Sequence, residues 1–172
     1  MKNKLFILAL FFSCVLHAQF VPGESARKRN SAMNEQFCLD NAGKTIGSGV
    51  CWELAIEAIK QGHPKDYYFV YDNRDKFEIK DLSKVIPGDI VILMNMLGSG
   101  SETDGHVGVV MVPVIDSVFC YADQNRGDDG EPIKKVMASD GHEYEVFEGS
   151  KVAGRRFFLR DVKKGTVKFY RF

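Results

Sequence analysis

The chain has 172 residues, of which 45% are hydrophobic and 12% aromatic. That length and composition suit one folded domain with a real core and exclude a disordered chain. Its 23 basic residues balance its 23 acidic ones. Because no basic stripe stands out in the sequence, we expect no nucleic-acid partner.

Residues 1–18 have the pattern of a secretory signal peptide. Two lysines precede an apolar run over residues 5–16, and Ala18 supplies a small residue before the expected cleavage site. The run is too short for a membrane-spanning helix, which needs about 20 apolar residues. We therefore expect a secreted or periplasmic protein with no membrane span. Acylation of Cys14 to give a lipoprotein, or a buried N-terminal helix, are the alternatives.

The first half of the mature chain is predicted to be mainly helical. Residues 19–44 are expected to form an N-terminal arm and helix, with a loose arm over 19–31 and a short helix over 30–42. A second helix begins at Cys51 and ends near residue 61, because Gly62 and Pro64 stop it. Its apolar residues recur at helical spacing, namely Cys51, Leu54, Ala55, Ala58 and Ile59. The aromatic, β-branched segment 67–71 predicts a strand.

The second half is predicted to be mainly strands. A turn at Pro87, Gly88 and Asp89 leads into a buried strand over 90–94, and a polar loop over 97–105 follows. A hairpin is expected from strands over 106–114 and 117–125, joined by a two-residue turn at Ile115 and Asp116. Weaker strand candidates are 134–137, 143–147, 155–159 and 167–170. Helices that precede an antiparallel sheet predict an α+β fold.

Cys51 is the first candidate for chemistry. At a helix N-terminus, unpaired backbone N–H groups and the helix dipole lower the pKa of a thiol and favour the reactive thiolate. Removal of the signal peptide leaves three cysteines, and an odd number in an oxidising compartment indicates a free thiol. The economical assignment is a disulfide between Cys38 and Cys120 with Cys51 free. The alternatives are that Cys51 is a small buried hydrophobe or is itself in a disulfide.

His106 and Asp123 are the candidates for its partners. His106 begins a strand, and Gly108 on the same face is expected to leave open space beside the imidazole. A histidine beside such a cysteine makes a thiolate–imidazolium pair. On the neighbouring strand, Asp123 with Asn125 on the same face is placed to accept from the second ring nitrogen. Alternatively, His106 is an edge residue of the core and Asp123 merely ends a strand.

These motifs, in this order, resemble the CHAP domain. They are the helix-start Cys51, the Pro-Gly-Asp turn at 87–89 with its strand, the Gly-His strand at 105–110, and Asp-Gln-Asn at 123–125. CHAP proteins are cysteine- and histidine-dependent amidohydrolases and peptidases of the papain-like superfamily, related to NlpC/P60. The resemblance covers residues 45–127, and the flanking segments carry no recognisable motif.

The resemblance implies a papain-like fold, with N-terminal helices packed on an antiparallel sheet and a catalytic domain over residues 45–172. It implies that Cys51 is the nucleophile and His106 the general base. Asp123 stands where CHAP proteins usually have a glutamate, and Asn125 stands where they have the following asparagine. Because aspartate is shorter, either Asp123 or Asn125 is left as the residue that orients the imidazole. Asp89 is expected to stabilise its turn.

The predicted function is therefore a secreted cysteine amidase or endopeptidase. It is expected to cleave peptide or N-acyl amide bonds, with peptidoglycan as the substrate that the resemblance implies. No cofactor or metal is expected, and the oligomeric state stays open. The alternative is a non-catalytic secreted binding module that retains the fold, or a structural protein in which Cys51 is disulfide-bonded.

Overall fold

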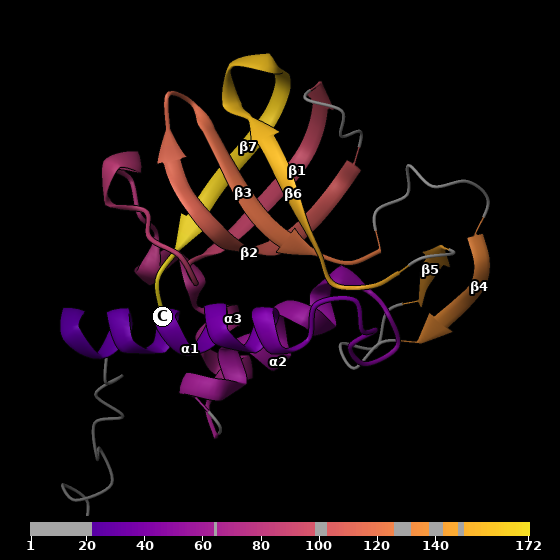
Figure 1. Ribbon diagram of the computed structural model, residues 1–172, viewed down its shortest axis with the longest axis horizontal. Coiled ribbons are helices and arrows are strands. Elements are labelled where there is room, and N and C mark those ends of the chain that lie inside the picture. The colour runs from indigo at the N-terminus through magenta and orange to yellow at the C-terminus, as the bar shows by residue number, and fades with distance from the viewer. Residues whose placement is uncertain (1–21, 64, 99–102, 126–131, 138–142, 148–149) are drawn as a thin grey trace, which may run out of the picture.

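Three helices lie against one end of a strongly curved antiparallel sheet in a computed structural model of the chain (Figure 1). The structure describes residues 22–63, 65–98, 103–125, 132–137, 143–147 and 150–172. The predicted signal peptide and Cys14 lie outside the described residues. Within the described part of the chain, no helix combines the length and apolar character that crossing a bilayer requires.

The helices precede the sheet along the chain, as the sequence predicts. The helices are α1 (Glu24–Asp40), α2 (Cys51–Gly62) and α3 (Tyr67–Asp72), followed by 3₁₀ turns at Arg74–Phe77, Leu82–Lys84 and Leu159–Asp161. The strands are β1 (Ile90–Gly98), β2 (Thr103–Ile115), β3 (Val118–Asp123), β4 (Pro132–Met137), β5 (Glu143–Phe147), β6 (Ala153–Phe158) and β7 (Val162–Tyr170). The main sheet has the order β6-β3-β2-β1-β7, and β4 and β5 form a separate hairpin. The predicted α+β fold class is confirmed.

Two hydrophobic clusters lie on opposite faces of the sheet. The first joins α2 to the sheet and includes Leu54, Ile59, Ile90 and Val109, all fully buried. The second fills the inside of the curved sheet and draws on all five of its strands, with Val91, Val110, Phe119, Phe157 and Phe169 among its members. Strand β1 alternates between the two clusters, which explains why its sequence is a continuous apolar run.

The turn before β1 fixes α1 to the sheet. Gly88 has φ +83°, and a Cβ at this position would lie 1.6 Å from the backbone oxygen of Ser31. The fully buried carboxylate of Asp89 accepts from the Ser31 hydroxyl at 3.0 Å and from two nitrogens of Arg171, each at 2.8 Å. Asp89 therefore stabilises its turn, as predicted, and also joins α1, β1 and the end of β7.

The prediction of a strand over 67–71 is wrong, because this segment is helix α3. The ring of Tyr71 packs edge-on against Trp52 of α2, with 4.1 Å between ring centroids, and Val70 is only 5% exposed. Packing of aromatic side chains against α2 therefore overrides the β propensity of the individual residues.

The first helix begins earlier than expected, at Glu24, so most of the predicted loose arm is helical. The buried side chains of α1 are mainly polar, namely Asn30, Ser31, Asn34 and Cys38. A helix that buries polar groups shows no apolar stripe in its sequence. The first two turns of α1 therefore carried no periodic signal.

The β2–β3 hairpin is confirmed, with its turn one residue later than predicted. The turn residues are Asp116 and Ser117, with φ values of 49° and 64°. Positive φ at both positions is the requirement of a two-residue hairpin turn whose twist matches the strands. Strands β1 and β2 also extend into the predicted loop over 97–105.

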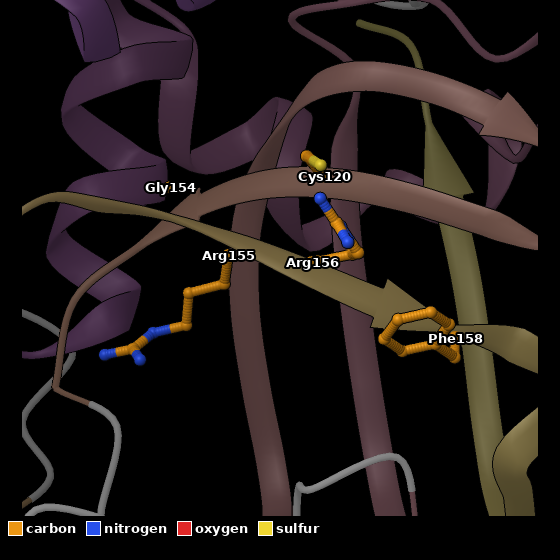
Figure 2. Close-up of a pocket in the computed structure, with 5 residues that line it drawn as sticks. All are labelled: Cys120, Gly154, Arg155, Arg156 and Phe158. Atoms are coloured by element: carbon orange, nitrogen blue, oxygen red, sulfur yellow. The ribbon is translucent and has the colours of Figure 1, made fainter.

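The predicted disulfide between Cys38 and Cys120 is wrong, because all three described cysteines are free. Cys38 is buried where α1 packs against α2 and β2, and burial raises its pKa to about 12. Cys120 lies on β3, in an open pocket of about 560 Å³ lined also by Gly154, Arg156 and Phe158 (Figure 2). An odd number of cysteines therefore reflects three separate thiols rather than one pair and one free residue.

Replacing Asp89 with alanine is expected to lower the free energy of unfolding by about 3–5 kcal/mol, because it leaves the buried guanidinium of Arg171 without its carboxylate. Urea denaturation measures the change. The control is Lys135→Ala, which removes an exposed ion pair with Glu143 and should cost less than about 1 kcal/mol. Equal effects of the two substitutions would contradict this role of Asp89.

Candidate active site

Cys51 is the first residue of α2, as the sequence predicts, and its side chain is partly exposed. Val50 is the N-cap of the helix and has extended backbone. The connector, residues 41–50, joins α1 to α2 and turns through Gly47 and Gly49, both at positive φ. The carboxylate of Glu53, in the first turn of α2, accepts hydrogen bonds from the backbone N–H and the hydroxyl of Ser48. The connector is therefore folded back onto the helix that it precedes.

His106 lies on β2, the strand against which α2 packs, and its imidazole lies close enough to the thiol of Cys51 to act on the pKa of the thiol. Burial alone raises the pKa of the thiol. The hydrogen bond and positive charge of His106, with the backbone N–H groups of Val107 and Trp52, outweigh burial and lower the pKa of Cys51 below its ordinary value. The site therefore favours a thiolate beside an imidazolium.

Asp123 holds the other side of the imidazole. It ends β3, and its Oδ2 lies 2.9 Å from Nε2 of His106. Burial lowers the pKa of His106, but the hydrogen bonds to Asp123 and Cys51 and the negative charges of both raise it to about 9. The described residues thus form a line from thiol to imidazole to carboxylate.

The space expected beside His106 is filled by Tyr121. A Cβ at Gly108 would lie 2.5 Å from Cδ2 of the Tyr121 ring and 2.6 Å from the backbone oxygen of Ala122. The ring of Tyr121 stands edge-on to the imidazole, with 6.3 Å between centroids. Gly108 therefore lets β3 and Tyr121 approach His106 closely, and the expectation of open space was wrong.

Asn125 is placed differently from the other three candidates. It follows β3 with φ 59°, and its side-chain oxygen accepts a hydrogen bond from the hydroxyl of Ser150 at 3.1 Å. The structure therefore brings Cys51, His106 and Asp123 together in one chain of contacts and ties Asn125 to Ser150. Of the two residues that the sequence left open, Asp123 is the one in contact with the imidazole.

Sequence reasoning missed two residues that support this site. Arg155 on β6 donates from Nε to Oδ1 of Asp123 at 2.8 Å, so the fully buried carboxylate is held between a guanidinium and an imidazole. Gln124, also fully buried, contacts the connector before Cys51. Arg155 lies after residue 127, in the part of the chain that carries no recognisable motif. Gln124 lies between the candidates Asp123 and Asn125, and its place in the Asp-Gln-Asn segment was a signal that could have identified it.

Trp52, the residue after Cys51, belongs to the core. It is 8% exposed and packs against Tyr71, whose burial raises its hydroxyl pKa to about 12.

Among the described residues, no group of three histidine, cysteine or acidic side chains is arranged to hold a metal ion.

One family model matches this chain over residues 24–172, and its description is the AIM3/BBC1 cysteine proteinase-fold domain. The match includes all of α1 and runs to the last residue. No curated protein matches the chain, and neither does any solved structure. The match agrees with the helix-then-sheet architecture and identifies the fold as that of a papain-like cysteine proteinase.

Replacing Asp123 with asparagine should lower the pKa of His106 from about 9 toward its ordinary value, because the substitution removes a buried negative charge beside the ring. The imidazolium is then lost at lower pH and stabilises the thiolate less, so the pKa of Cys51 rises. At pH 8, which lies between the ordinary pKa of histidine and the raised value of about 9, alkylation of Cys51 by iodoacetamide should slow by about tenfold or more. Asp161→Asn, on an exposed turn, is the control. An unchanged pH profile of alkylation in Asp123→Asn would reject this account.

Proposed function

Because the chain belongs to the AIM3/BBC1 cysteine proteinase-fold family, we propose that it is a cysteine hydrolase that cleaves peptide or N-acyl amide bonds. The observation that carries the proposal is the contact chain from Cys51 through His106 to Asp123, in which the thiol pKa is lowered and the imidazole pKa is raised. This is the arrangement that activates a cysteine nucleophile.

The first half of the proposed reaction forms a thioester on Cys51. The thiolate attacks the carbonyl carbon of the amide, and the carbonyl oxygen gains negative charge. The proposed donor that stabilises this charge is the backbone N–H of Cys51, at the start of α2. The imidazolium of His106 then gives its proton to the leaving nitrogen, the C–N bond breaks, and the amine departs.

The second half releases the acid. The neutral imidazole of His106 takes a proton from water, and the resulting hydroxide attacks the thioester carbon. The C–S bond breaks, the carboxylic acid leaves, and Cys51 returns to the thiolate beside an imidazolium. Through both halves Asp123 holds Nε2 and so fixes the orientation of the imidazole.

The proposed substrate class comes from the resemblance to CHAP domains. The helix-start cysteine, the Gly-Asp turn, the Gly-His strand and the Asp-Gln-Asn segment follow one another in the CHAP order, with Asp123 in place of the usual glutamate. We propose cell-wall peptide as the substrate on this basis. We also propose export through residues 1–18, whose composition is that of a signal peptide.

A binding module that retains this fold is the competing proposal. The description of the matching family refers to a fold and not to an activity, which favours this alternative. The two proposals differ in turnover: a hydrolase releases products continuously, whereas a binding module retains its ligand unchanged.

Cys51→Ser and His106→Ala should each abolish release of peptide fragments from purified peptidoglycan, because one removes the nucleophile and the other removes its proton carrier. Mass spectrometry of the soluble products measures the effect, and thermal unfolding shows that the variants are folded. Cys120→Ser, which alters a thiol outside the contact chain, should retain activity. Equal release by the wild type and either site variant would overturn the mechanism, and binding without release by the wild type would favour the binding module.

A further inference from the structure

The connector before Cys51 is built in a way that leaves its position dependent on side-chain contacts. Gly43, Gly47 and Gly49 all have positive φ, and glycine at such positions has more backbone freedom than any other residue. The first part of the connector is held by segment 150–152 through backbone hydrogen bonds between Gly43, Lys44 and Val152. The part nearest to Cys51 is held differently.

Gln124 binds that second part through every polar atom of its side chain. Its Oε1 accepts from the backbone N–H of Ile46 at 3.0 Å, and its Nε2 donates to the oxygen of Ile46 at 2.9 Å. The same Nε2 donates to the oxygen of Val50 at 2.7 Å. Val50 is the residue before Cys51 and the N-cap of α2, so the amide holds the backbone directly at the start of that helix.

Gln124 follows Asp123 in the chain, and this adjacency joins the two halves of the site. Asp123 holds the imidazole of His106, whereas Gln124 holds the residue before the thiol. Both side chains are fully buried, and their Cα atoms are about 3.8 Å apart because one peptide bond links them. The end of β3 therefore contacts both the imidazole and the backbone before the nucleophile.

We propose that Gln124 is a positioning residue, which fixes the start of α2 so that the sulfur of Cys51 stays within hydrogen-bond reach of His106. It touches no substrate and acts through Val50 and Ile46. This inference rests on the proposed function for its effect on turnover, but its effect on the thiol is measurable without any substrate.

The test compares Gln124→Met with Asn34→Leu. Each substitution replaces a buried amide with an apolar side chain of similar size, and Asn34 donates to the backbone oxygen of Gly88 at 3.0 Å, in the turn before β1. Both variants should unfold at lower temperature than the wild type. Only Gln124→Met should slow iodoacetamide alkylation of Cys51 at pH 6, by about tenfold, because a displaced thiol loses imidazolium support.

Turnover gives a second readout if the chain is a hydrolase. Gln124→Met should lower kcat by roughly 100-fold with little change in KM, because a displacement of about 1 Å at the reacting atoms costs that much. Slow alkylation of the wild type at pH 6 would reject the proposed function itself. Fast alkylation of the wild type that Gln124→Met leaves unchanged would overturn the positioning role alone.

Two further measurements apply if Gln124→Met does not fold. Gln124→Asn keeps the amide but shortens its reach by one methylene, and it should also slow alkylation. In the wild type, the backbone N–H of Ile46 should be protected from exchange with deuterium, because Gln124 holds it in a part-buried hydrogen bond. Rapid exchange at Ile46 would overturn the proposal without any variant.

Discussion

The shared imidazole of His106 is the interaction on which the site depends. The ring lies between a thiol at a helix N-terminus and a buried carboxylate, and these two groups raise its pKa to about 9. Burial of the thiol opposes ionisation, and the positive ring reverses this effect. If the imidazolium were removed, Cys51 would be another partly buried thiol whose environment favours the protonated form.

Two buried carboxylates among the described residues show how this charge is supported. Asp89 and Asp123 are both fully buried, and each is paired with an arginine, Arg171 and Arg155 respectively. Buried ion pairs seldom stabilise a protein more than well-packed apolar residues would, so stability alone does not explain them. The carboxylate of Asp89 also accepts hydrogen bonds from Ser31 and from the backbone of the turn before β1, whereas the carboxylate of Asp123 also binds His106. The same chemistry thus serves architecture in one place and the candidate site in the other.

The sequence predicted the parts of the site that depend on local rules. Apolar periodicity predicted the start of α2 at Cys51. The pairing of His106 with Asp123 was predicted from a hairpin in which alternate residues of each strand share a face. Helix α3 and the early start of α1 were missed because tertiary packing determines them: aromatic rings pack on Trp52, and polar side chains are buried under α1. Arg155 was missed because it reaches Asp123 from β6, which pairs with β3 but is distant from it in sequence.

The sheet positions His106 and Asp123, whereas the connector positions Cys51. The site therefore needs residues that restrain the connector in addition to these three groups. His106 and Asp123 lie on adjacent strands, where ladder hydrogen bonds fix their separation. Cys51 comes from outside the sheet, after a connector with three glycines at positive φ, and its place depends on packing, on side-chain contacts and on the backbone hydrogen bonds between the connector and Val152. The precision of the thiol–imidazole contact is therefore limited by the connector, and the groups that restrain the connector, Glu53 from the helix side and Gln124 from the sheet side, determine how well it is held.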